Sequence, residues 1–244
     1  MSVAPVSLAT AVDRTRTGDL WLFRGRTTAD RLIQTLTNAP VNHVGVAIVL
    51  EDMPPLIWHA EMGRSLTDVW TGRRQRGVQL HDLEAAVRQW TGPYGQRGWF
   101  RQITPEVGRA HEDALLECVA RLDGVSFPSA GRLTARWVRG RWAARGGLRP
   151  GGKGDDDDPE RQRFARPWRR TRQRATPARR VEAAYCAEVV GTTLEAAGIL
   201  LPARDSSWYD PGRFWSGDDL PLAPGWRYGR EIAVTVPAPD PAGR

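Results

Sequence analysis

Residues 42–62 read NHVGVAIVLEDMPPLIWHAEM, two runs of mostly apolar residues on either side of a turn with two prolines. The β-branched content of the first run and the alternation in the second predict two strands joined as a hairpin through EDMPP. Because successive side chains of a strand point to opposite faces, the first strand has two unlike faces. One is bulky and apolar, as a core face should be, and comprises Val44, Val46, Ile48 and Leu50. The other comprises His43, Gly45, Ala47 and Val49.

The face that carries His43 is the candidate for chemistry. Gly45 and the alanine beside it leave room for another element or a ligand. On the returning strand His59 and Glu61 share one face, so they supply neighbours for His43. A general base needs such a neighbour, because a hydrogen bond to one ring nitrogen fixes the tautomer and directs the other nitrogen to the nucleophile. Counting across a tight turn sets Glu61 opposite His43 and displaces His59 by one pair, whereas a bulge would change this register, so both stay candidates.

Three further segments have clear secondary-structure signals. The run GDLWLF at 18–23 predicts a short strand. The run TTADRLIQTLTN at 27–38 predicts a helix with Thr27 as its N-cap. In HEDALLECVARLDG, residues 111–124, apolar residues recur at helical spacing and include Cys118. We therefore expect Cys118 to pack in the core.

A second thiol lies near the start of a predicted helix. An apolar stripe runs from Cys186 to about Ala197, and Gly198 is a natural helix end. A thiol at a helix N-terminus meets the positive end of the helix dipole and free backbone N–H groups, which lower its pKa and can hold the oxyanion of an acyl transfer. The preceding residues VEAAY, 181–185, could instead extend the helix upstream and make Cys186 an ordinary core residue. The residues alone leave both interpretations open.

Positive charge is concentrated in one segment. The chain has a formal net charge of +7, and nine arginines fall within 161–180, just after a Gly/Pro stretch with four consecutive aspartates. Such a composition buries too little apolar surface to offset the entropy of ordering, so we expect a flexible charged insertion over 143–178. A solvated linker is the simpler interpretation, and an anionic partner such as nucleic acid or acidic lipid is the alternative.

The rest of the sequence predicts one domain in two pieces, 17–142 and 179–235, with a flexible N-terminus over 1–16 and a flexible tail over 236–244. No apolar run approaches the roughly 18 residues of a membrane span, and we see no signal peptide. We therefore expect a cytoplasmic protein with no transmembrane segment. Its two cysteines should then stay reduced, as separate thiols.

The order NHVGVAIV, IWHAEMG and AAYCAEVV resembles the circularly permuted NlpC/P60 proteins of the papain-like superfamily. The resemblance implies an α+β fold, with an antiparallel β-sheet or half-barrel packed against a helix that bears the nucleophile. By position it implies Cys186 as nucleophile, His43 as general base and His59, in preference to Glu61, as the residue that orients His43. Ala187 departs from the pattern, since many relatives have serine there.

The function implied by this resemblance is a cysteine hydrolase that cleaves an amide or ester bond through a thioester, with no cofactor and no metal. The substrate would be a small peptide-like or lipid-like molecule, which the sequence does not identify. An acyltransferase on the same site and an inactive binding module with an arginine-rich segment are the alternatives. A zinc site at Cys186, His43 and His59 is disfavoured, because the sequence has no C-x-x-C or H-E-x-x-H spacing.

Overall fold

The computed structural model describes residues 4–25, 40–61, 63–122, 186–202, 208–216 and 220–237. Its elements, in chain order, are β1 (Val6–Ser7), α1 (Leu8–Asp13), β2 (Leu20–Arg24), β3 (His43–Ile48), β4 (Leu56–Glu61), β5 (Gly77–Asp82), α3 (Leu83–Thr91), β6 (Arg97–Arg101), β7 (Ile103–Thr104), α4 (Arg109–Leu122), α7 (Cys186–Ala196), the 3-10 helix η3 (Pro211–Phe214), β8 (Arg227–Tyr228) and β9 (Ile232–Thr235).

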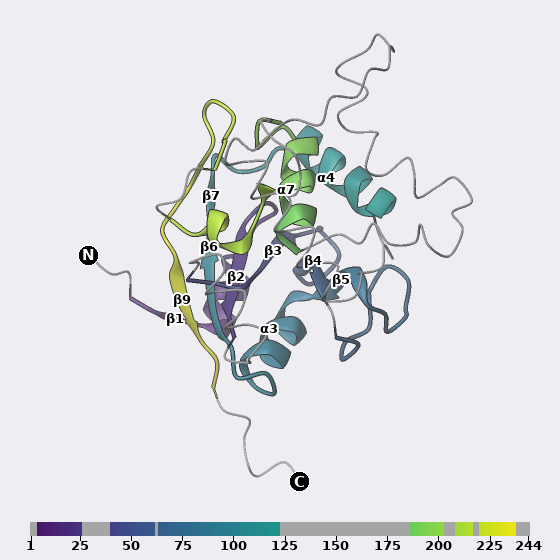
Figure 1. Ribbon diagram of the computed structural model, residues 1–244, viewed down its shortest axis with the longest axis vertical. Helices are drawn as coiled ribbons and strands as arrows, with labels where there is room; N and C mark the ends of the chain where they lie inside the picture. The colour runs from purple at the N-terminus through teal and green to yellow at the C-terminus, as the bar shows by residue number, and fades with distance from the viewer. Residues whose placement is uncertain are drawn as a thin grey trace, which may run out of the picture.

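A seven-stranded sheet organises the fold, in the order β1-β9-β6-β2-β3-β4-β5 (Figure 1). Its neighbouring strands are antiparallel except β1 and β9, which are parallel. Strands β7 and β8 form a separate antiparallel pair. The predicted hairpin is confirmed as β3 and β4, in which Ala47 faces Ile57. The protein is therefore a mixed α+β structure with a mostly antiparallel sheet.

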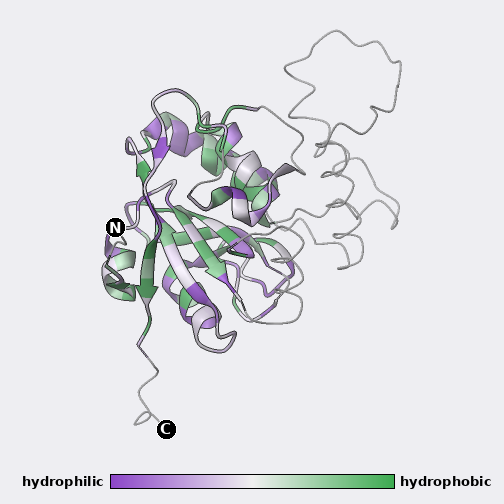
Figure 2. Ribbon diagram, turned by 60° about the vertical axis from the view of Figure 1, so that its left-hand side comes forward, coloured by the Kyte–Doolittle hydropathy of each residue, from purple (hydrophilic) through white to green (hydrophobic). Residues whose placement is uncertain are grey.

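Both faces of the sheet are covered, and each has its own apolar core. Helix α7 packs on β3 and β4, with α4 against α7, while α3 packs against β4, β5 and β6. Figure 2 shows the strands, with much of the hydrophobic green, between helices on both sides. One core contains residues of α4 and α7 with Leu20, Leu22, Val44, Val46, Trp58 and Leu80, and the other contains residues of α1 and α3 with Trp21, Phe23, Ala47, Ile57 and Phe100. This division follows the alternation of side chains along each strand.

The N-terminal expectation was wrong for part of 1–16. Within it, Val6–Ser7 forms β1 and pairs with β9, and α1 follows directly. Ser7 caps this helix by accepting a hydrogen bond from the Thr10 N–H at 3.1 Å, and Leu8 is buried in the second core. A short amphipathic helix at a chain end is ordered here because its apolar side chains complete a core. The predicted helix at 27–38, the charged insertion at 143–178 and the tail beyond 237 lie outside the described residues.

Of the two expected occupants of the space at Gly45, another element or a ligand, the structure shows the first. A Cβ atom built on Gly45 would lie 2.7 Å from Cδ1 of Ile57 and 3.2 Å from Cβ of His59. The space that a side chain at Gly45 would need is thus occupied by side chains of β4. Among the described helices, none combines the length and the apolar character needed to cross a bilayer.

Candidate active site

Three neighbouring strands bring polar side chains together on the face of the sheet that α3 covers. On β4 and β5, His59 pairs with Gln79 and Ile57 pairs with His81. The β3–β4 register, continued from Ala47 and Ile57, sets Glu61 opposite His43. His43, His59 and His81 therefore form a diagonal row across the three strands.

A chain of hydrogen bonds follows this row. His43 Nε2 lies 3.1 Å from His59 Nδ1, His59 Nε2 lies 3.0 Å from His81 Nδ1, and His81 Nε2 lies 3.2 Å from Gln79 Oε1. Because an amide oxygen only accepts, His81 must donate from Nε2 to Gln79. Neutral imidazole has one N–H, so His59 then donates from Nε2 to His81, and His43 donates from Nε2 to His59. In this arrangement Nδ1 of His43 is the unprotonated nitrogen.

The row of histidines lies beside an aromatic ring, with His59 and His81 buried and His43 half-buried. Trp90 of α3 lies edge-on to His43 and His59, with ring centroids 4.8 and 4.7 Å away. Burial lowers the pKa of His43 to about 4 and that of His81 to about 4, the latter opposed by the charge of Asp68. Burial, followed by the neighbouring histidines, also lowers the pKa of His59. All three rings are thus neutral at pH 7, as the hydrogen-bond chain requires.

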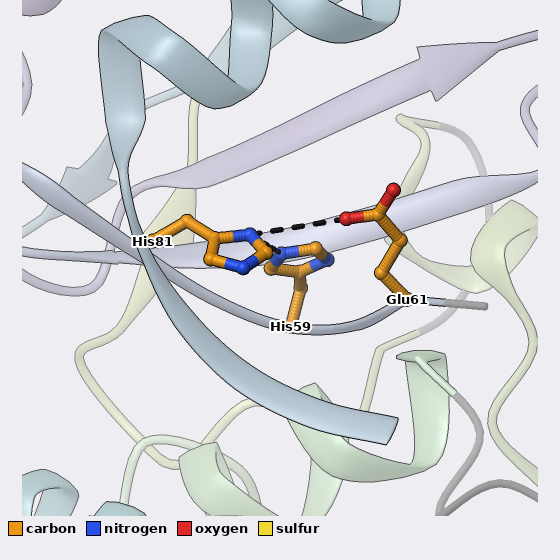
Figure 3. A group of neighbouring side chains, drawn as sticks. All are labelled: His59, Glu61 and His81. Carbon is orange, nitrogen blue, oxygen red and sulfur yellow. Dashed lines mark hydrogen bonds and ion pairs between the residues drawn. The ribbon is translucent and has the colours of Figure 1, made fainter. Parts of the chain in front are cut away.

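Glu61 is directed to His81 and not to His43. Its Oε2 lies 3.8 Å from Nδ1 of His81 (Figure 3). Its Oε1 accepts a 3.5 Å hydrogen bond from the Tyr94 hydroxyl. Burial raises the pKa of Glu61, while the Trp90 and Tyr94 side chains favour the ionised form. The contact that His43 makes is the diagonal one to His59, although Glu61 is its partner in the register.

Cys186 is the first residue of α7 within the described chain and belongs to the opposite core. Its sulfur accepts hydrogen bonds from the backbone N–H groups of Val44, Ala187 and Cys186 itself, which lower the thiol pKa. Burial outweighs them and raises this pKa to about 12, with a further rise from the charge of Asp210. The expected lowering of the pKa by the helix N-terminus is therefore wrong for this structure, because the same position is 4% exposed.

The thiol and the imidazole approach consecutive residues of β3 from opposite faces. The sulfur lies at the amide of Val44, whose side chain points into the core of α7, whereas the His43 ring points toward α3. Among the described residues, no hydrogen bond joins the Cys186 sulfur to His43. Cys118 has no part in this arrangement: it lies within α4, is 2% exposed and donates to Thr193 Oγ1 at 3.5 Å, as expected of a core thiol.

Sequence reasoning missed His81 and Gln79. The segment GVQLHD at 77–82 alternates as a strand does, and this pattern puts both residues on one face. That signal was available in the sequence. The pairing of this strand with β4 was not, since residues 62–76 separate the two strands.

Comparison with known proteins identifies no family for this chain, because neither a family model nor a curated protein matches it. Among solved structures, it is similar to one described as the crystal structure of metalloprotein yiiX from Escherichia coli O157:H7. That similarity has a TM-score of 0.46 and 15% sequence identity, and covers 89% of this chain and 98% of that chain. A similarity of this size assigns neither a family nor an activity.

Proposed function

We propose that this protein is a cysteine hydrolase of amides or esters, built on a circularly permuted papain-like fold of the NlpC/P60 type. In this proposal Cys186 is the nucleophile, His43 the general base and His59 the residue that orients His43. The observation that carries it is the hydrogen-bond chain from His43 to Gln79, which leaves Nδ1 of His43 as an acceptor. A thiol at the adjacent backbone amide is the group that such an acceptor would serve.

The mechanism begins from a neutral thiol. Since burial raises the pKa of Cys186 to about 12, the sulfur holds its proton until a base removes it. The sulfur must leave the Val44 amide and reach Nδ1 of His43, whose ring points to the other face of β3, so the thiol, the imidazole or both must move before attack. Catalytic hydrogen bonds in ligand-free enzymes are often long and tighten only with substrate.

The reaction then proceeds by acyl transfer. His43 Nδ1 takes the thiol proton as the sulfur attacks the carbonyl carbon, and the backbone N–H groups of Cys186 and Ala187 can hold the oxyanion. Collapse of this intermediate breaks the bond to the leaving group, which takes the proton from His43. Water, activated by the same imidazole, then attacks the thioester and releases the acid. In an acyltransferase a second acceptor replaces water, and peptide-like and lipid-like acyl groups fit either route.

Acylation of the whole protein by p-nitrophenyl acetate tests the proposal. We expect intact-mass spectrometry to show one acetyl adduct, and peptide mapping to place it on Cys186. Replacing the base, as His43→Gln, should slow adduct formation by about 100-fold or more, the usual contribution of a general base. His111→Ala is the matched control, because His111 packs on Trp226 away from the row and should leave the rate unchanged. A folded wild type that neither forms an adduct nor releases p-nitrophenol above the uncatalysed rate, or a His43→Gln variant that reacts as fast as wild type, would overturn the proposal and favour a binding module.

A further inference from the structure

We propose that His59, Glu61 and His81 form a binding site for one divalent transition metal ion of the Zn²⁺ type. Each side chain offers one ligand atom, and the three atoms lie within 4.8 Å of one another. Figure 3 shows the two rings and the carboxylate beside one another, with dashed lines from one nitrogen of His81 to Glu61 and to His59. This ligand set differs from the zinc set considered for the sequence, because it shares only His59 with it and contains neither Cys186 nor His43.

The spacing suits a tetrahedral ion. Zinc binds imidazole nitrogen and carboxylate oxygen at roughly 2.0–2.2 Å, which separates the ligands of a tetrahedral site by roughly 3.4 Å. Here Nε2 of His59 lies 3.0 Å from Nδ1 of His81, and that nitrogen lies 3.8 Å from Oε2 of Glu61. These two distances bracket the zinc value, and the third, between His59 and Glu61, is no more than 4.8 Å, so the side chains must adjust to hold an ion. Two imidazoles and one carboxylate are also a ligand set that zinc sites with an open fourth position use.

The other ring nitrogens are already held as in metal sites. Histidine ligands usually bond through their second nitrogen to a carbonyl, a carboxylate or another polar group, which fixes the ring orientation. His81 has Gln79 Oε1 at 3.2 Å from its Nε2, and His59 has His43 at 3.1 Å from its Nδ1. Both rings are therefore held through their other nitrogens, while Nε2 of His59 and Nδ1 of His81 face each other at 3.0 Å and must turn apart to share an ion.

An unsatisfied carboxylate oxygen points independently to a cation. Glu61 is 7% exposed, and its Oε2 is buried with no hydrogen-bond donor in the described part of the chain. Burying such a group without a partner is costly. Oε2 is also the atom that faces His81, so a cation bound there would satisfy it. The neutral rings of His59 and His81 cannot do so in the tautomers that the hydrogen-bond chain imposes.

Metal binding by the full-length protein tests this inference directly. After dialysis against EDTA, titration with Zn²⁺ in a calorimeter should show one site, and Co²⁺ should give the visible absorption of a four-coordinate or five-coordinate complex. Glu61→Gln keeps the side-chain shape and should weaken binding by about 100-fold or more, since even partners outside the ligand set are worth 10–100-fold. Gln79→Met removes the acceptor for His81 and should weaken binding by about 10-fold or more.

Two controls separate this site from other sources of metal affinity. His111→Ala removes the one histidine outside the row of three, and Cys186→Ala removes the proposed nucleophile. Both variants should retain one site of unchanged affinity. Circular dichroism and the unfolding midpoint establish that each variant is folded. A wild type that binds no metal, or binding that folded Glu61→Gln retains in full, overturns the inference. Loss of binding in Cys186→Ala would assign the metal to the thiol and overturn it as well. None of these outcomes depends on whether the protein is a hydrolase.

Discussion

In a Cys118→Ala variant, where Cys186 is the only remaining thiol, reaction with 4,4′-dithiodipyridine should be slow at neutral pH and should accelerate about tenfold per pH unit up to at least about pH 9.5. The reason is that burial raises the pKa of Cys186 to about 12, although three backbone N–H groups contact the sulfur. The thiolate is the reactive form, so its fraction sets the rate. No plateau should be reached in this pH range.

The expected magnitude follows from this pKa. At pH 7.4 the thiolate fraction is roughly 3 × 10⁻⁵, against roughly 7% for a free cysteine of pKa about 8.5, a difference of about 3000-fold. A more basic thiolate attacks disulfides faster, because the logarithm of its rate constant rises by about 0.4–0.5 for each unit of pKa. This effect raises the expected rate of the native thiolate by about 40-fold and so offsets part of the difference. The native thiol should therefore react at least about 70-fold more slowly than the same thiol in the urea-unfolded chain, and poor access to the buried sulfur would widen the gap.

The assay is the release of thiopyridone, followed by absorbance from about pH 6 to pH 9.5 on native and urea-unfolded protein. A rate that levels off below about pH 8.5 would refute the reasoning, because it would show that the helix N-terminus lowers the pKa more than burial raises it. In that case the protein would hold a preformed thiolate, and in the proposed mechanism His43 would act only as a proton donor. With a log-linear profile, the proposed mechanism instead requires His43 to remove the proton during attack.

Three substitutions test the packing that holds the site, each by urea unfolding. Gly45→Ala should cost about 1–3 kcal/mol, because the new methyl group would lie 2.7 Å from the side chain of Ile57. Gly191→Ala on α7 should cost a similar amount, because the new Cβ would lie 2.4 Å from the ring of Tyr209. Arg101→Met should cost about 3 kcal/mol or more, because the guanidinium donates to the carbonyl groups of Phe214, at 2.5 Å, and Gly229, at 2.7 Å, and lies 3.6 Å from a buried carboxylate.

A second glycine variant and a double variant in the same sheet serve as controls for these losses of stability. At Gly98 the nearest atom to an added Cβ is 3.4 Å away, so Gly98→Ala should change the free energy of unfolding by no more than about 0.5 kcal/mol. Equal losses in Gly45→Ala and Gly98→Ala would contradict the steric explanation. Replacing the carboxylate partner as well, in Arg101→Met with Glu231→Gln, should recover part of the loss, since no buried charge is then left uncompensated.

The sequence was informative where local periodicity decides the structure. Alternation over 43–48 and 56–61 predicted the hairpin and its two faces, and helical spacing predicted the core position of Cys118. Counting residues across the turn also agrees with the observed β3–β4 pairs, whose register, if continued past Val46, sets Glu61 opposite His43. Which neighbour His43 bonds is a different question, because the length and direction of the rings bring the diagonal His59 within reach.

What the sequence could not supply depends on contacts between distant segments. Strand β1 has two residues and pairs with Val234 and Thr235, more than 200 residues away, so no local pattern marks it. The burial that raises the pKa of Cys186 likewise comes from the whole core around α7. The helix-dipole argument concerned only the local helix end, and was therefore wrong about the direction of the shift.

If both proposals hold, metal binding and general-base catalysis require different tautomers of the histidine row. A metal bound to Nε2 of His59 takes the lone pair there, so the proton of this ring must sit on Nδ1 and be donated to Nε2 of His43. Neutral His43 then carries its own proton on Nδ1, which is the nitrogen that should accept the proton of Cys186. Without metal the bond between these two rings runs the other way: His43 donates from Nε2 to His59, because Gln79 accepts at the other end of the chain. The ion would thus switch off the base through the tautomer of His43, without touching the thiol.

Saturating Zn²⁺ should therefore slow acylation of Cys186 by about 100-fold, the value of a lost general base, and EDTA should restore the rate. Glu61→Gln provides the decisive comparison, because it weakens the metal site while Glu61 has no part in the hydrogen-bond chain from His43 to Gln79. In this variant the ratio of rates with and without Zn²⁺ should approach one at the same metal concentration. An equal loss in wild type and Glu61→Gln would mean that Zn²⁺ acts elsewhere, for example by binding the sulfur directly. The competition between metal and base would then be refuted, whatever the affinity of the three-residue site.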